Sequence, residues 1–311
     1  MKFFPYLFSK KEKYTIDGRE VILISRTKED FPPKLREIIL IVCRTQSIAQ
    51  HFAKLTFVVE EFEEENKDIS GFINAEELRE GKNIVHLNVD KLRENTESDS
   101  VREFEKKWHG NIIHELTHLL HDNTTQIIKK YIITRNRLSQ SLIKNELSHS
   151  TIRIQLFNFI RNIFIEGLAV GYQLSRTGYL LYAERVFEIL YRDAQTGMNA
   201  IIIGLNSYYV TKKKNTSSTK LFENLEKVLK HQTSFTGYHL VYTILFIDHK
   251  MTLEKIMPLT PFEFIRKYEA CMLSKGLQPV ISLTSGRGIF DYKKTLQSWT
   301  AIAKELKEKR P

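Results

Sequence analysis

The amino-acid sequence predicts an α+β fold, in which a small mixed or antiparallel sheet with one helix precedes a mainly α-helical part. Short runs rich in β-branched residues occur within the first hundred residues, whereas a helical spacing of apolar residues dominates after residue 100. The chain of 311 residues is 42% hydrophobic and 27% charged, which is typical of a globular protein and not of a disordered one. We therefore expect an α/β subdomain at 1–99 and a helical subdomain at 100–311, acting as one unit.

The N-terminal subdomain is expected to hold strands and one long helix. Three runs have the length and composition of strands, namely 20–25, 54–59 and 84–89. The last of these, IVHLNV, alternates apolar and polar residues as a half-buried strand does. A shorter strand is expected at 69–74. Pro32 and Pro33 are expected to open a helix that reaches about residue 53, because proline is favoured in the first turn.

The helical subdomain is expected to begin at Ser100, since Ser100 and Glu103 form the pattern of a capping box. Apolar residues then recur at helical spacing along most of the remaining chain. The expected helices lie at about 101–122, 125–145, 151–175, 179–196, 197–209, 219–231, 236–249, 261–274 and 291–308. Two polar stretches, 211–219 and 282–288, are expected to be loops.

The sequence lacks the usual signals for export or membrane insertion. The apolar run at the N-terminus is about six residues long and contains Pro5, so it is shorter than the roughly 7–15 residues of a signal peptide. No stretch approaches the roughly 18 apolar residues of a membrane span. Cys43 and Cys271 are expected to be small buried side chains in a reducing compartment. We therefore expect a cytoplasmic protein without a membrane partner, and the oligomeric state is left open.

The run HELTH at 114–118 places two histidines four residues apart, with Glu115 directly after the first. In a helix, positions i and i+4 lie about 40° apart around the axis, so His114 and His118 can face one ion. Glu115 projects about 100° from His114, where it can reach a water without being a ligand. Two neutral nitrogen ligands and one carboxylate base are what a hydrolytic zinc site needs. We predict that His114 and His118 bind a metal ion and that Glu115 is the general base.

Glu166 is the expected third ligand, because it stands within the apolar helical run at 152–174. A lone buried carboxylate is costly unless it is paired or binds a metal. Gly167 is a poor residue for a helix interior and predicts close packing of two helices at this point. The alternative interpretation is an ion pair of Glu166 with Arg161 or Arg176.

HELTH followed by IEGLAVGY at 165–172 resembles the gluzincin, or peptidase-MA-like, branch of the zinc metallopeptidases. The resemblance implies one Zn²⁺ per chain held by His114, His118 and Glu166, a zincin-like helical subdomain, and hydrolysis of a peptide or protein substrate. It extends over roughly residues 55–275, and the run at 84–89 resembles the edge strand above the zinc in that clan. Such a strand could hold an extended substrate by adding it to the sheet.

Some positions differ from the patterns of this clan. The tyrosine that stabilises the transition state in aminopeptidase-type relatives is Ser234 here, and we expect Tyr238, His239 or Tyr172 to take that role. The motif that recognises a free N-terminus is absent, and the aspartate that follows the third ligand in thermolysin-like enzymes is replaced by Val170. Candidates for orienting the histidines are Asn111, Asn162 and Asp122, while His109 and His121 are expected near the site, with His121 as a rim residue or competing ligand.

Two further interpretations remain open. HELTHLLHD also resembles cytosolic regulatory metallopeptidases that cleave phage repressors or respond to DNA damage. The net charge of +10 is compatible with binding of nucleic acid, although no nucleic-acid-binding motif accompanies it. The alternative function is therefore an inactive or subordinate zinc-binding regulator that binds nucleic acid or a protein through a basic surface. The basic residues concerned are Lys129, Lys130, Arg135, Arg137, Lys144, Arg153 and 212–214.

Overall fold

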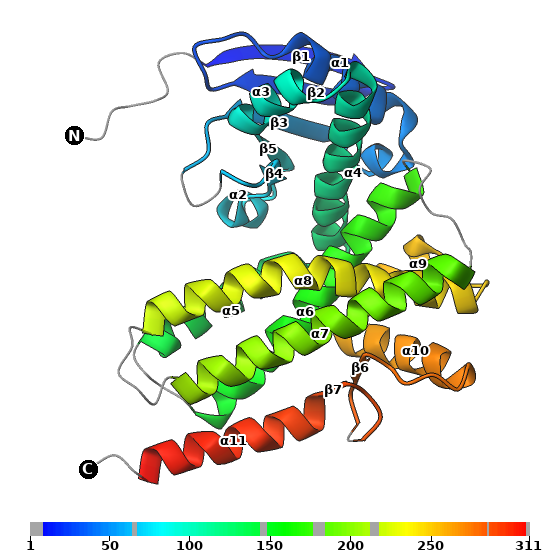
Figure 1. The fold of residues 1–311 in the computed structure, drawn as a ribbon. Helices are drawn as coiled ribbons and strands as arrows, with labels where there is room; N and C mark the ends of the chain where they lie inside the picture. The colour runs from blue at the N-terminus through cyan, green and yellow to red at the C-terminus, as the bar shows by residue number, and fades with distance from the viewer. Residues whose placement is uncertain are drawn as a thin grey trace. The chain divides into compact units, whose positions relative to one another are not determined.

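The structure is a computed structural model that describes residues 9–63, 67–143, 148–176, 184–211, 218–284 and 286–308. The chain forms two compact units (Figure 1). The first consists of residues 1–123 and 172–180, and the second of residues 124–171 and 181–311. The α+β class is confirmed, because a five-stranded sheet lies near the N-terminus and the rest is mainly helical. The units divide after residue 123, whereas the sequence suggested a boundary at 99/100.

The sheet belongs to the first unit and is mixed, with the strand order β1-β2-β3-β5-β4. Its strands are β1 (Lys10–Ile16), β2 (Arg19–Ser25), β3 (Lys54–Glu60), β4 (Gly71–Phe72) and β5 (Ile84–Asn88). The pairs β1–β2 and β4–β5 are antiparallel, and the pairs β2–β3 and β3–β5 are parallel. Of these strands, only β1 was not predicted: its charged sequence exposes most of its side chains and hides the alternation that marks a half-buried strand.

The expectation that the run at 84–89 forms an edge strand is wrong. β5 pairs with β3 on one side and with β4 on the other, where Gly71 faces Leu87 and Phe72 faces His86. The short strand β4 is therefore the edge strand at this end of the sheet among the described residues.

The helical elements of the first unit are α1 (Pro33–Thr45), the 3₁₀-helix η2 (Ser47–His51), α2 (Ala75–Arg79), α3 (Val89–Ser98) and most of α4 (Val101–Thr125). The expected helix at 33–53 ends at Thr45, because Gln46 is extended. The short helices α2 and α3 were not predicted. Each begins with an asparagine, Asn74 or Asn88, whose side chain accepts hydrogen bonds from two backbone N–H groups of the first turn.

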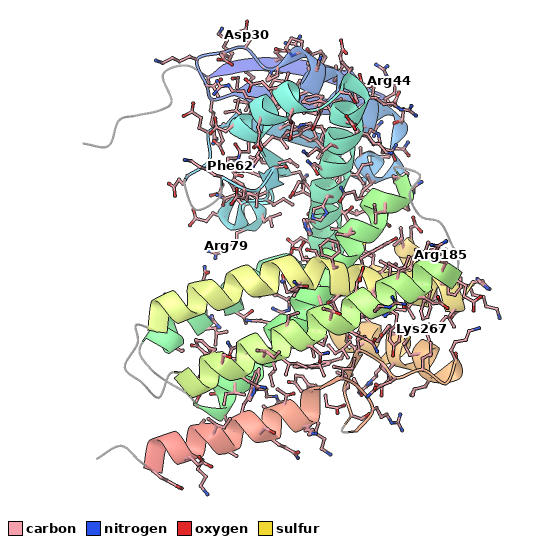
Figure 2. The ribbon with its side chains drawn as sticks, viewed as in Figure 1. Asp30, Arg44, Phe62, Arg79, Arg185 and Lys267 are labelled. Carbon is pink, nitrogen blue, oxygen red and sulfur yellow. The ribbon has the colours of Figure 1, made fainter. Side chains whose placement is uncertain are left out.

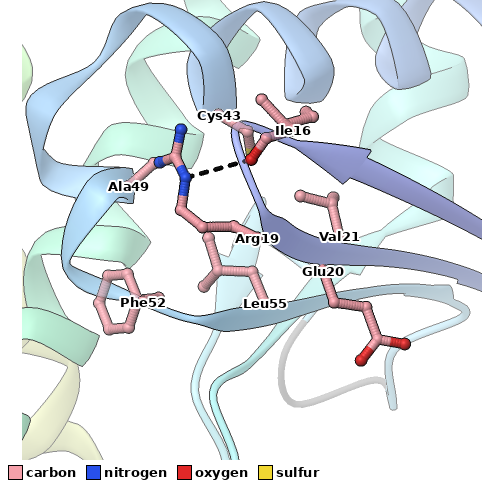
Figure 3. A pocket seen from close by; sticks show the side chains of 8 residues that line it. All are labelled: Ile16, Arg19, Glu20, Val21, Cys43, Ala49, Phe52 and Leu55. Carbon is pink, nitrogen blue, oxygen red and sulfur yellow. Dashed lines mark hydrogen bonds between the residues drawn. The ribbon is translucent and has the colours of Figure 1, made fainter.

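The core of the first unit is apolar and includes Cys43, which is buried as expected. Burial raises the pKa of the Cys43 thiol to about 12, so this thiol is unreactive at neutral pH. Figure 3 shows a shallow hollow beside it, where the Arg19 guanidinium donates a hydrogen bond to the carbonyl of Ile16. The hollow is lined mainly by apolar side chains, with Arg19 and Glu20 as its charged residues.

The second unit is built mainly from helices, coloured from green to red in Figure 1. They are α5 (Ile127–Ile143), α6 (His149–Arg176, whose last turn belongs to the first unit), α7 (Glu184–Thr211), α8 (Ser218–Ile247), α9 (Leu253–Ile256), α10 (Pro261–Ser274) and α11 (Tyr292–Glu308). The short strands β6 (Ile281–Ser282) and β7 (Phe290–Asp291) pair beside the expected loop at 282–288. None of the described helices is long and apolar enough to cross a membrane.

The helices α7 and α8 each replace two expected helices. Gly197 and Gly237 lie inside them and do not break them. Glycine weakens a helix by only about 1 kcal/mol relative to alanine, and tertiary packing overrides that preference. Most of the expected loop at 211–219 lies outside the described residues.

Candidate metal centre

Helix α4 forms as the sequence predicts and carries the HELTH run. The backbone N–H of Ser100 donates to the Glu103 carboxylate at 3.0 Å, and the N–H of Glu103 donates to Ser100 Oγ at 3.3 Å, which completes the capping box. The apolar stripe predicted to begin at Val101 is buried from Phe104 onward, at Trp108, Ile112, Leu116 and Leu119, whereas Val101 itself is exposed. These contacts fix the rotation of α4 about its axis, and thus the direction in which His114 and His118 point.

His114 and His118 aim their ring nitrogens at a common point. Their Nε2 atoms are 3.1 Å apart, and the two rings are nearly perpendicular, with centroids 4.7 Å apart. In a tetrahedral zinc site with Zn–N distances of about 2.0–2.1 Å, two ligand nitrogens are separated by about 3.4 Å. The observed separation is close to that value, so the pair fits a shared metal ion.

Glu115 lies beside the edge strand β4. Only 8% of its surface is exposed. A Cβ atom placed on Gly71 would lie 3.2 Å from Glu115 Cγ and 3.0 Å from the carbonyl oxygen of His86. Glycine at this position lets β4 approach β5 and α4 closely, because a larger residue would make its neighbours shift by a few tenths of an ångström. The candidate general base is therefore next to the edge of the sheet, a neighbour that the sequence analysis did not identify.

Glu166 lies on α6 at the point where that helix meets α8. A Cβ atom on Gly167 would be 2.3 Å from the backbone of Gly237, and one on Gly237 would be 2.2 Å from the carbonyl oxygen of Ile163. No other residue fits at either position without moving a helix backbone. The predicted close packing at Gly167 is confirmed, and its partner is Gly237.

Two side-chain contacts support the same crossing. Asn162 Nδ2 donates to Thr233 Oγ1 at 3.1 Å, and Ser234 Oγ donates to Glu166 Oε2 at 3.5 Å. The alternative partners of Glu166 also have other contacts: Arg161 donates to Thr134 Oγ1 at 2.9 Å, and Arg176 donates to Ser47 Oγ at 3.1 Å.

The three predicted ligands form a group of suitable donors. One ligand atom from each of His114, His118 and Glu166 lies within 4.8 Å of the other two, and all three side chains are half-buried. It is the one such group of histidine, cysteine or carboxylate side chains among the described residues. Two imidazole nitrogens and one carboxylate oxygen are the donor set of many catalytic zinc sites. The chemistry and the spacing of these residues therefore fit Zn²⁺.

Contacts in the first unit also bring the end of α6 to α4. A Cβ atom on Gly110 would lie 3.0 Å from Nε2 of Gln173, so the last turn of α6 packs against α4 one turn before His114. Gln173 follows Glu166 by two helical turns on the same helix.

The three residues expected to stabilise the oxyanion are all buried. His239 is fully buried, its Nε2 lies 3.1 Å from the Tyr268 hydroxyl, and burial lowers its pKa to about 3. His239 is thus a neutral residue of the core of the second unit, which does not favour a catalytic role. Tyr238 is 7% exposed and packs edge-on against Tyr242, and Tyr172 is 3% exposed.

The other polar residues expected near the site also have defined places. Burial lowers the pKa of half-buried His109, and burial together with the charge of nearby His118 lowers the pKa of His121 to about 3. Asp122 is buried, and Asn162 is bonded to Thr233. The buried side-chain amide nitrogen of Asn111 has no hydrogen-bond partner within the described part of the chain.

The basic residues outside the site are partly described. Lys130, Arg137 and Arg153 are exposed, and the other predicted members of the basic surface have side chains outside the described set. Comparison of the chain with protein-family models, with curated proteins and with solved structures found no match.

Proposed function

We propose that the protein is a zinc-dependent metallopeptidase in which His114, His118 and Glu166 hold one Zn²⁺ per chain. The observation that carries the proposal is the grouping of these three donors next to a buried carboxylate, Glu115, on the same helix as the two histidines. A metal-binding role alone would not need a carboxylate at that position. Hydrolysis does need one, because the attacking water must lose a proton.

In the proposed mechanism, bound zinc supplies Lewis acidity that polarises the scissile carbonyl and makes water more acidic. Glu115 accepts a proton from the attacking water as the new C–O bond forms at the carbonyl carbon. It then delivers that proton to the amide nitrogen as the C–N bond breaks, which yields a carboxylate and an amine.

The substrate proposed for this site is an extended peptide bound along β4. The sheet ends at β4 among the described residues, and its outer edge offers backbone groups for strand addition. Gly71 brings that edge directly against Glu115. This assignment replaces β5, which lies inside the sheet.

Substitution of the proposed base tests this function. We expect Glu115→Gln to retain zinc and to lose at least about a hundredfold in the rate of peptide cleavage, since general bases contribute roughly 10²–10⁴-fold. The measurement is cleavage of a proteome-derived peptide library by zinc-loaded protein. Glu105→Gln, an exposed position on the same helix, is the matched control and should cleave as the wild type does. A zinc-loaded wild type that cleaves no peptide, or an active Glu115→Gln variant, would contradict the proposal.

A further inference from the structure

Away from the candidate metal centre, the first unit contains a histidine in an unusual environment, His86 on β5. Its side chain is only 3% exposed, yet each ring nitrogen contacts a carboxylate. Nδ1 lies 2.5 Å from Glu60 Oε1, at the end of β3, and Nε2 lies 2.6 Å from Glu77 Oε2, on α2. The other Glu60 oxygen accepts a hydrogen bond from Arg26 at 2.8 Å.

This arrangement fits a charged imidazole between two ionised carboxylates. An ionised carboxylate can only accept hydrogen bonds, so both ring nitrogens of His86 must carry a proton to satisfy both neighbours. With His86 protonated, the two cations His86 and Arg26 balance the two anions Glu60 and Glu77. A neutral His86 would lose one hydrogen bond and leave a carboxylate facing a lone pair.

The charged ring also holds the edge strand. His86 stacks on Phe72 of β4, with ring centroids 4.7 Å apart and planes within 10°. Phe72 in turn packs edge-on against Phe62, labelled in Figure 2, with ring centroids 4.9 Å apart. Successive residues of a strand face opposite sides of the sheet. The contact of Phe72 with His86 on one face therefore holds Gly71 against Glu115 on the other.

We propose that His86 is a positioning residue whose protonated ring clamps β4 and α2 to the sheet and so holds the edge strand against Glu115. The clamp is a property of the first unit alone. Its relevance to a peptide substrate rests on the proposed function. Residues 72–77 are tied by the ring, through Phe72 and Glu77. Residues 67–70 are tied separately by Asn88, whose amide nitrogen donates to the carbonyls of Lys67 and Ile69.

The clamp makes the order of residues 72–77 dependent on pH. Burial alone would lower the pKa of His86, but the hydrogen bonds and charges of Glu60 and Glu77 outweigh it and raise the pKa above 6.5. Glu60 on β3 and Glu77 on α2 contact the ring directly, Arg26 bonds to Glu60, and Glu115 on α4 lies beyond Gly71. A raised pKa means that the clamp contributes fully below about pH 6.5 and is lost as the pH rises through the folded-state pKa.

Hydrogen exchange of the backbone amides tests the clamp. In the wild type, protection of residues 72–79, corrected for the intrinsic rate, should fall about tenfold between pH 6 and the alkaline side of the His86 titration. Protection of residues 67–70 should change little, because Asn88 holds them. In His86→Gln, protection of 72–79 should be low at every pH. Equal protection of 72–79 in wild type and His86→Gln at every pH would overturn the proposal.

A second variant keeps the test decisive if His86→Gln does not fold. Glu77→Gln removes one carboxylate from a partly exposed position, so the NMR titration midpoint of His86 should move to lower pH. His51→Asn, an exposed histidine of the same unit, is the control and should leave both readouts unchanged. A wild-type His86 midpoint at or below pH 6.5, the ordinary value of a histidine, would refute the clamp. Neither readout needs zinc or peptide cleavage, so a failure here is distinct from a failure of the proposed peptidase function.

Discussion

The two halves of the candidate metal centre are positioned in different ways. His114 and His118 lie four residues apart on α4, so the spacing of one helix brings their nitrogens to 3.1 Å. Glu166 depends on a tertiary contact, the crossing of α6 and α8 at Gly167 and Gly237, where neither helix has room for a Cβ atom. The histidine half is therefore a local structure, and the glutamate half depends on residues about 70 positions away in the sequence.

This difference predicts where substitutions act. A change that disturbs the α6–α8 crossing should weaken metal binding through Glu166 and leave the two histidines in place. The histidine half should tolerate changes at a distance, because its geometry is maintained by the hydrogen bonds of α4 and by the buried stripe of that helix.

The largest effect on stability is expected from Gly237→Ala. The added Cβ would meet the backbone of Ile163 and Gly167, which cannot move aside as a side chain can, so the free energy of unfolding should fall by about 3 kcal/mol or more. Gly197→Ala is the matched control, because its nearest neighbour is the flexible amide end of Gln232, and its stability should stay within about 1 kcal/mol of the wild type. Urea unfolding of both variants gives the comparison, and equal stabilities would refute the proposed rigidity of the crossing.

A smaller effect is expected from Ser234→Ala. The serine hydroxyl donates to one oxygen of Glu166, and loss of an outer-shell partner commonly lowers metal affinity by about 10–100-fold. Because this hydrogen bond is long, at 3.5 Å, we expect a loss of zinc affinity at the lower end of that range, about tenfold. The free energy of unfolding should not change. The zinc affinity can be measured by competition with a fluorescent zinc chelator. Thr236→Ala, a neighbouring buried hydroxyl on α8, should keep wild-type affinity. An unchanged affinity in Ser234→Ala would mean that this hydroxyl does not position Glu166.

Much of the histidine half could be predicted from the sequence, because its signals lie within a few neighbouring residues. The capping box at Ser100, the apolar stripe of α4 and the i, i+4 histidines each depend on a few neighbouring residues. Gly167 also predicted a close helix contact, since glycine inside an apolar helix costs stability unless packing requires it.

The glutamate half and the other features that depend on tertiary contacts could be predicted only in part. Gly237 lies inside α8 and contacts Gly167, and no local pattern pairs two glycines 70 residues apart. The run at 84–89 was expected to be the edge strand because it resembles that strand of the gluzincin clan, whereas the actual edge strand, β4, has only two residues and is too short to show a period. His86 was read as an ordinary member of the alternating run at 84–89, because its partners Glu60 and Glu77 come together only when β3, β5 and α2 have folded.

The most direct test of the central claim is the zinc content of Glu166→Ala compared with the wild type. After loading and removal of loosely bound metal, we expect about one zinc per wild-type chain, as a site with three protein ligands implies. We expect Glu166→Ala to lose at least a hundredfold in affinity, more than the loss typical of an outer-shell residue. Unchanged zinc in Glu166→Ala would contradict the claim that the α6–α8 crossing supplies the third ligand, and wild-type protein that binds no zinc would contradict the metal centre itself.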